Sequence, residues 1–180
     1  MSYGPKPWQQ LHWDARAAAN FMLGGTGAGL LVAWAVSAAV TPAWQAFVFV
    51  GLACIGLGLG AVWLEIGRKL RAVNVFFHPQ TSWMTREAMV AVVLFGFGLA
   101  ALAFGARALG FAAAFVALGF VYCQGRILHA SKGIPAWREP TVTAFIVTTG
   151  LAEGAGAFLA GAALAGGSHR AGLAFFALAV

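Results

Sequence analysis

Five long apolar stretches constrain this chain more than any other feature of its sequence. They span about 17–40, 44–66, 87–106, 109–128 and 141–165. An α-helix needs about 20 mainly apolar residues to cross the hydrocarbon core of a bilayer. Because lipid offers no hydrogen bonds to the backbone, a spanning segment of this kind has to be helical. The sequence therefore predicts an all-α fold, a polytopic transmembrane helical bundle with five complete helices.

A sixth apolar stretch begins near Ala171 and is still apolar at Val180. A membrane helix is expected to continue until it reaches polar residues at the membrane surface. We therefore expect 171–180 to be part of a sixth helix that is followed by others. Residues 1–180 would then form a single membrane domain. The segment before the first stretch has no basic start and no small-residue cleavage site, so we expect no removable signal peptide.

The composition supports a membrane protein and excludes a nucleic-acid-binding one. Of the 180 residues, 61% are hydrophobic and 9% are charged, whereas a soluble domain has about 45–50% apolar and about 25% charged residues. Lipid therefore has to cover much of the surface. The net charge of +6 does not indicate nucleic acid, because the basic residues lie between the apolar stretches and form no continuous stripe.

The positive charges also predict an orientation. Nine of the eleven Lys and Arg residues lie on the side of the N-terminus: Lys6, Arg16, Arg68, Lys69, Arg71, Arg86, Arg126, Lys132 and Arg138. Arg107 and Arg170 lie on the other side. Because positively charged loops stay in the cytoplasm, we expect a multi-pass protein of the bacterial inner membrane. Its N-terminus and its long loops, 67–86 and 129–140, would face the cytoplasm.

Three pairs of glycines have the spacing that lets two membrane helices approach closely. These pairs are Gly25/Gly29, Gly56/Gly60 and Gly150/Gly154. Small residues four positions apart allow the backbones of two helices to touch. We interpret all three pairs as packing surfaces.

Glu65 is the first candidate for chemistry. It precedes Arg68 by three residues and Lys69 by four, a spacing that places all three on one helix face. Two interpretations stay open. Glu65 is either part of an ion pair that fixes the helix end, or a carboxylate that binds a quinone headgroup and carries its proton.

Four further candidates lie on the same side of the membrane. Glu87 is near the start of the third stretch, where a helix N-terminus favours a carboxylate. Arg126 ends the fourth stretch, where a long basic side chain reaches the interface. His78 and His129, in or beside the loops, are either solvated or able to donate a hydrogen bond to a quinone carbonyl.

Glu153 differs from these because it lies deep in the fifth stretch. Twelve residues at 1.5 Å each place it about 18 Å from the start of that helix, beyond the middle of a core about 30 Å thick. It is either a proton relay or a packing residue among Gly150, Gly154 and Gly156. The first possibility corresponds to an alternative function as a small transporter or proton-conducting membrane protein.

The cysteines and histidines give no metal or haem site. Cys54 and Cys123 lie in separate apolar stretches and form no paired motif. A membrane haem needs histidine ligands within helices, and all four histidines fall outside the helix centres. We therefore expect neither haem nor metal in this chain.

Four motifs together resemble a known family. They are FMLGGTGAGL at 21–30, LEIGRKLRAVNVF at 64–76, SWMTREAM at 82–89 and GRILHASKGIPAWREP at 125–140. In order and spacing they are similar to the membrane anchor subunits of dimethyl sulfoxide reductase type, within the polysulfide-reductase/NrfD superfamily. The resemblance covers roughly 8–160.

This resemblance implies a fold, a function and a set of partners. Anchors of this type have eight helices and no haem. They exchange electrons between quinone, either menaquinone or ubiquinone, and an iron–sulfur subunit. That subunit exchanges electrons in turn with a molybdopterin catalytic subunit. The resemblance thus implies a quinone-reactive anchor in a molybdoenzyme complex, such as those of anaerobic respiration, and not the subunit that converts the substrate.

The resemblance also assigns roles to the ambiguous charges. Glu65 stands where relatives have a quinol-binding histidine, and it is implied to be a quinone ligand and proton carrier, with Arg68, His78 and His129 beside it. Glu87 matches a carboxylate that opens the third helix, and Arg126 matches an arginine before the second long loop. The chain departs from the best-known anchors in orientation, since these dock their partners on the periplasmic side.

Overall fold

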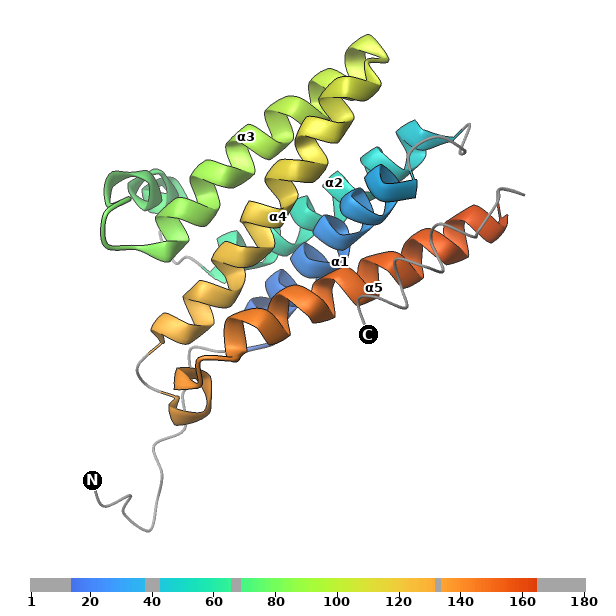
Figure 1. Ribbon diagram of the computed structural model, residues 1–180. Helices are drawn as coiled ribbons and strands as arrows, with labels where there is room; N and C mark the ends of the chain where they lie inside the picture. Colours follow the sequence, from blue (N-terminus) through green and yellow to red (C-terminus); the bar gives the residue numbers. More distant parts are fainter. Residues whose placement is uncertain (1–13, 38–42, 66–68, 132–133, 165–180) are drawn as a thin grey trace, which may run out of the picture.

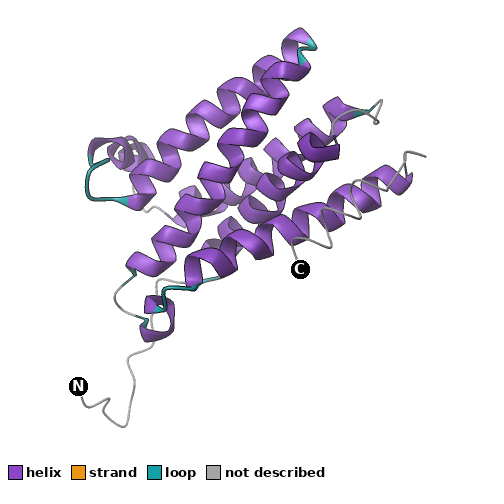
Figure 2. Cartoon of the chain, in the orientation of Figure 1, coloured by secondary structure: helices purple, strands orange, loops and turns teal. Residues whose placement is uncertain are grey.

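The computed structural model describes residues 14–37, 43–65, 69–131 and 134–164, and every regular element in these ranges is a helix (Figure 2). The five long helices are α1 (Ala15–Ser37), α2 (Trp44–Glu65), α3 (Trp83–Phe104), α4 (Arg107–Ala130) and α5 (Val142–Leu164). Two short 3-10 helices, η1 (Lys69–Phe77) and η2 (Pro135–Arg138), lie between them. All five long helices are long and apolar enough to cross a bilayer. The predicted all-α transmembrane bundle is therefore confirmed. The stretch 171–180 lies outside the described residues.

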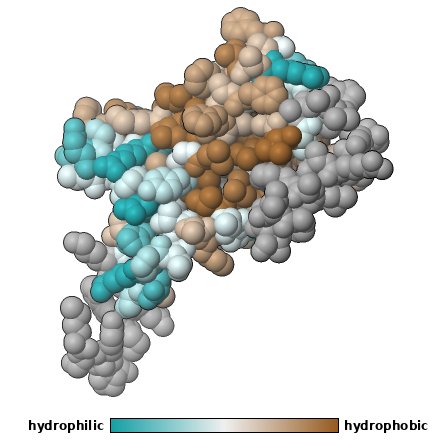
Figure 3. Space-filling model, viewed as in Figure 1, coloured by the Kyte–Doolittle hydropathy of each residue, from teal (hydrophilic) through white to brown (hydrophobic). Residues whose placement is uncertain are grey.

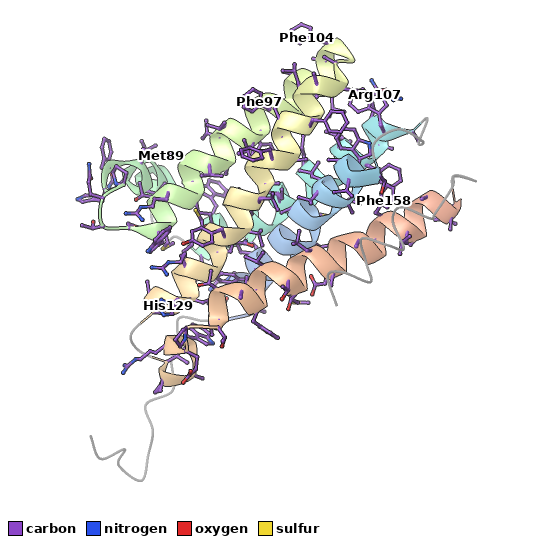
Figure 4. The ribbon with its side chains drawn as sticks, viewed as in Figure 1. Met89, Phe97, Phe104, Arg107, His129 and Phe158 are labelled. Atoms are coloured by element: carbon purple, nitrogen blue, oxygen red, sulfur yellow. The ribbon has the colours of Figure 1, made fainter. Side chains whose placement is uncertain are left out.

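Successive long helices run in opposite directions along the bundle (Figure 1). The starts of α1, α3 and α5 and the ends of α2 and α4 consequently meet at one end, together with η1 and η2. We call this the η end. The opposite end carries Arg107 at the start of α4, and Figure 4 shows Arg107 and His129 at the two ends of that helix.

Helix α1 is the centre of the bundle. It packs against α2, α4 and α5, whereas α3 packs mainly on α4. The core contains large side chains from all five long helices, and Leu31, Ile55, Leu94, Phe120 and Phe158 are fully buried there. This arrangement leaves α1 the most buried of the five spans.

Large apolar side chains also cover the outside of the bundle, where a soluble protein would be polar. Leu57, Val92, Phe104, Phe115 and Phe145 are all exposed. Figure 3 shows this apolar surface over the middle of the molecule and hydrophilic residues gathered at the η end. This distribution fits a bundle whose middle section is surrounded by lipid.

Two of the three predicted glycine pairs pack against each other. A Cβ atom on Gly29 would collide with the carbonyl of Gly150, and one on Gly154 would collide with the backbone of Gly29. Gly25 also meets Gly150, so the backbones of α1 and α5 touch directly. We call this contact, formed by Gly25, Gly29, Gly150 and Gly154, the glycine seam. The packing role predicted for these two pairs is confirmed.

The third pair does not form such a contact. A Cβ atom on Gly56 would meet the ring of Phe95 on α3 at 3.4 Å, and one on Gly60 would meet no described atom within 4 Å. The close backbone packing predicted for Gly56/Gly60 is therefore not confirmed among the described residues.

Two helix boundaries change the setting of candidate residues. The Ser82 hydroxyl caps α3 by accepting a hydrogen bond from the Thr85 amide at 3.3 Å, so the helix begins at Trp83 and not near 87. Glu87 consequently lies in the second turn and does not open the helix. Helix α4 continues to Ala130, which places His129 in its last turn and not in the loop.

Candidate functional site

A cavity of about 690 Å³ lies at the η end, between the start of α1, the end of α2, η1, the start of α3 and the end of α4. Most of its wall is apolar or aromatic, with Phe21, Trp63 and Trp83 as the largest side chains. Cavities of this size with mainly apolar walls and a few polar groups are typical of small-molecule sites. The mainly apolar lining suits a largely apolar ligand.

Two of the predicted site residues, Glu65 and Glu87, line this one cavity. Glu65 is the last residue of α2 and is partly exposed, whereas the Glu87 side chain on α3 is only 5% exposed. The fold therefore places one carboxyl group at the boundary of the bundle and a second one inside it. Such a pair is suited to passing a proton between the surface and a bound molecule.

Glu87 belongs to a buried polar network that joins three helices. The Asn20 side chain on α1 donates from Nδ2 to Glu87 Oε1 over 3.4 Å. The Gln124 side chain on α4 donates from Nε2 to the backbone carbonyl of Asn20 over 2.9 Å. Gln124 is fully buried, and Asn20 is 4% exposed. The carboxyl group is therefore held by helices that are far apart in the sequence.

The same network contains two buried acceptors without a partner. Asn20 Oδ1 and Gln124 Oε1 have no hydrogen bond from any described residue. Buried polar atoms almost always find a partner, and the described residues supply no donor to these two oxygens. Asn20 itself lines the cavity.

Sequence reasoning about charged residues missed Asn20 and Gln124. Both are uncharged amides inside predicted spans, at 17–40 and 109–128. Amide side chains in membrane helices commonly make hydrogen bonds between helices. That signal was available in the sequence, although it does not say which helices the amides join.

The other candidates on this side do not line the cavity. The Arg126 guanidinium lies 4.8 Å from the ring centroid of Trp83, whose side chain is part of the cavity wall. His78 is exposed in the turn before α3, and His129 is partly buried in the last turn of α4. Arg68 lies outside the described residues, so its predicted position beside Glu65 stays a prediction.

Glu153 lies apart from this site. It is the twelfth of the 23 residues of α5, at the middle of that helix, and its side chain is exposed. The hydroxyl of Thr26 on α1 donates to Glu153 Oε2 over 2.8 Å. This bond crosses the glycine seam between α1 and α5, so Glu153 contributes to the contact between these helices.

Among the described residues no group of three or more His, Cys, Asp or Glu side chains is placed to hold a metal ion. Cys123 is buried and Cys54 is partly buried, and both are free thiols. The polar groups at the cavity are carboxyl, amide, hydroxyl and indole N–H groups. These are hydrogen-bonding and proton-transfer groups.

Comparison with known proteins identifies one family. The family described as "DMSO reductase anchor subunit (DmsC)" matches residues 26–167. This range includes all of α2, α3, α4 and α5 and the second half of α1. No curated protein and no solved structure matches the chain significantly.

Proposed function

The chain belongs to the DMSO reductase anchor subunit (DmsC) family, and on this premise we propose that it is the quinone-reactive anchor of a molybdopterin oxidoreductase. In this proposal it transfers electrons between the quinone pool and an iron–sulfur subunit. The observation that carries the proposal is the cavity that Glu65 and Glu87 share at the η end.

The cavity wall suits both states of the substrate. A quinone and its quinol differ by two electrons and two protons, so the site has to hold an apolar ring and exchange protons at its oxygens. Trp63 and Phe21 offer flat apolar surfaces, and aromatic rings prefer stacked or edge-on contacts. The volume of about 690 Å³ accommodates one such ring.

The two carboxyl groups take different roles in this proposal. Glu87, held by Asn20, forms a hydrogen bond with one oxygen of the substrate. Glu65, partly exposed at the end of α2, exchanges the proton with water. Arg126 acts on the cavity only through Trp83, on whose ring its guanidinium lies.

We further infer that the η end faces the cytoplasm and that the iron–sulfur subunit docks there. Among the described residues this end carries Arg16, Arg86, Arg126 and Arg138, whereas the other end carries Arg107. An excess of basic residues marks the cytoplasmic side of a membrane protein. Docking at this end would bring a soluble electron carrier next to the cavity.

Replacement of Glu65 tests the proposed chemistry in the purified complex. Loss of a proton-transferring group costs about 10²-fold to 10⁴-fold in rate. We expect Glu65→Gln to lower quinone-coupled turnover by about 10²-fold or more, while reduction or oxidation of an artificial dye by the catalytic subunit is unchanged. Glu139→Gln is the matched control, because Glu139 is an exposed carboxylate at the same end that does not line the cavity.

Two results would contradict the proposal. Unchanged quinone kinetics in the Glu65→Gln variant would remove the assigned role of this residue. Purification without iron–sulfur and molybdenum-containing chains would remove the anchor function itself, and it would favour the transporter alternative.

A further inference from the structure

Two guanidinium groups lie on one aromatic ring at the η end. Arg86 lies 4.1 Å and Arg126 4.8 Å from the ring centroid of Trp83, and Tyr122 meets the same ring edge-on at 5.9 Å. Cations are attracted to the face of an indole. Trp83 therefore contacts two positive charges on the α3–α4 side of the bundle.

Neither charge has an anionic partner within the part of the chain that the structure describes. Arg86 donates from Nε and Nη2 to the backbone carbonyls of Pro79 and Gln80, at 2.8 and 2.9 Å, and these acceptors are neutral. Arg126 Nε is buried and makes no hydrogen bond. Two guanidinium groups that contact one ring attract an anion with several acceptor oxygens.

The surface beyond this site is apolar and has the length of one lipid leaflet. Tyr122, Leu118 and Phe115 follow Arg126 along α4 toward the middle of the bundle, at spacings that keep them on one side of the helix. They are 45%, 38% and 77% exposed. Phe115 lies eleven positions before Arg126, a rise of about 16 Å, against about 15 Å for half of the hydrocarbon core.

Figure 4 shows apolar side chains on the neighbouring helix as well, with Met89 and Phe97 along α3. The two arginines are thus at the polar end of an apolar surface that both helices form. An anion bound there would sit at the level of the lipid headgroups, and anything attached to it would extend along that surface.

We propose that Arg86 and Arg126, held on Trp83, bind the phosphate of an anionic phospholipid whose acyl chains lie along the exposed strip of α4. Basic groups between membrane helices at the cytoplasmic side are known to favour such headgroups. The proposal does not depend on the quinone chemistry. A free phosphate ion offers the same oxygens, but it makes no use of the apolar strip.

The test measures lipid binding by the purified complex in detergent, by native mass spectrometry and by thermal unfolding. The probes are phosphatidylglycerol, phosphatidylcholine and inorganic phosphate. We expect the wild-type protein to bind phosphatidylglycerol at least about tenfold more tightly than phosphatidylcholine, a difference of about 1.4 kcal/mol. We expect Arg126→Gln to remove most of this preference and Arg126→Lys to retain part of it.

Arg107→Gln is the matched control, because Arg107 lies near Trp44, 5.9 Å from its ring centroid, at the other end of α4. It should leave the preference unchanged. An equal loss in this control would show a nonspecific effect of charge and overturn the proposal. Saturation by inorganic phosphate alone would overturn it in favour of a free-anion site. Release of the iron–sulfur subunit from Arg126→Gln, with unchanged lipid binding, would overturn it in favour of a protein contact.

Discussion

Asn20 and Glu87 are 67 positions apart in the sequence, and a hydrogen bond of 3.4 Å joins their side chains at the wall of the cavity. Both side chains are buried. The bond connects α1 to α3, and α3 otherwise packs mainly on α4. The position of the buried carboxyl group in the proposed quinone site therefore depends on a contact between two helices.

Replacement of Glu87 should separate catalysis from stability. Glu87→Gln keeps an oxygen that accepts the hydrogen bond from Asn20, but it cannot exchange a proton at that atom. We expect quinone-coupled turnover to fall at least tenfold, which corresponds to about 1.4 kcal/mol, with an unfolding midpoint close to that of wild type. Glu87→Leu should lower both quinone-coupled turnover and the unfolding midpoint. It leaves the buried Asn20 amide unpaired, at a cost of about 1–3 kcal/mol. Normal quinone turnover in Glu87→Gln would exclude Glu87 from the chemistry.

The Asn20–Glu87 bond should appear as coupling in a double-mutant cycle. Hydrogen bonds between membrane helices contribute about 0.6 kcal/mol on average and at most about 1.7 kcal/mol. We expect a coupling free energy in this range between Asn20→Ala and Glu87→Ala, measured by reversible unfolding in mixed micelles. The pair Asn20→Ala and Glu153→Ala serves as control, since no contact joins these residues. Equal coupling in both pairs would show that the bond has no specific effect.

The glycine seam should tolerate no side chain at Gly154. A Cβ atom there collides with the backbone of Gly29 and Leu30, whereas one on Gly156 has no described atom within 4 Å. Overpacking typically costs about 1–3 kcal/mol, and a contact with backbone cannot be relieved by turning a side chain. We expect Gly154→Ala to lower the unfolding midpoint clearly and Gly156→Ala to leave it unchanged. Equal stability of the two variants would mean that α1 and α5 are not in direct contact.

Glu153 should be dispensable for quinone chemistry. Glu153→Gln keeps an oxygen that can accept the hydrogen bond from Thr26, and Glu153 does not line the cavity. We expect quinone-coupled turnover within about twofold of wild type, a difference of less than about 0.5 kcal/mol. The transporter alternative makes a different prediction for the chain in liposomes without its soluble subunits. Proton flux that the wild-type chain supports and the Glu153→Gln variant loses would support that alternative.

The transmembrane helices could be predicted from the sequence because length and apolarity are local properties of a stretch of about 20 residues. Apolarity alone did not set their ends. The third helix starts at Trp83 because the Ser82 hydroxyl caps it, and a serine before an apolar stretch is itself a sequence signal for a helix N-terminus.

Some residues of the candidate site could also be predicted from the sequence. Glu65 and Glu87 were candidates because charged residues at the edge of a membrane span are costly and few, and the motifs around them resemble those of the family that was later matched. The interpretation of the glycines was confirmed for Gly25/Gly29 and Gly150/Gly154 but not for Gly56/Gly60, because spacing alone does not say whether another helix backbone lies close.

The sequence by itself determined that this chain crosses the membrane as a bundle of helices and that its basic residues gather at one end. Only the tertiary structure decided that Glu65 and Glu87 share a cavity, that Asn20 and Gln124 hold the second of them, and that Arg126 lies on Trp83 outside it. The physical reason is that hydropathy is summed along the chain. The meeting of two polar side chains depends instead on how each helix is rotated and how closely its neighbours pack. In this bundle that packing includes the glycine seam between α1 and α5.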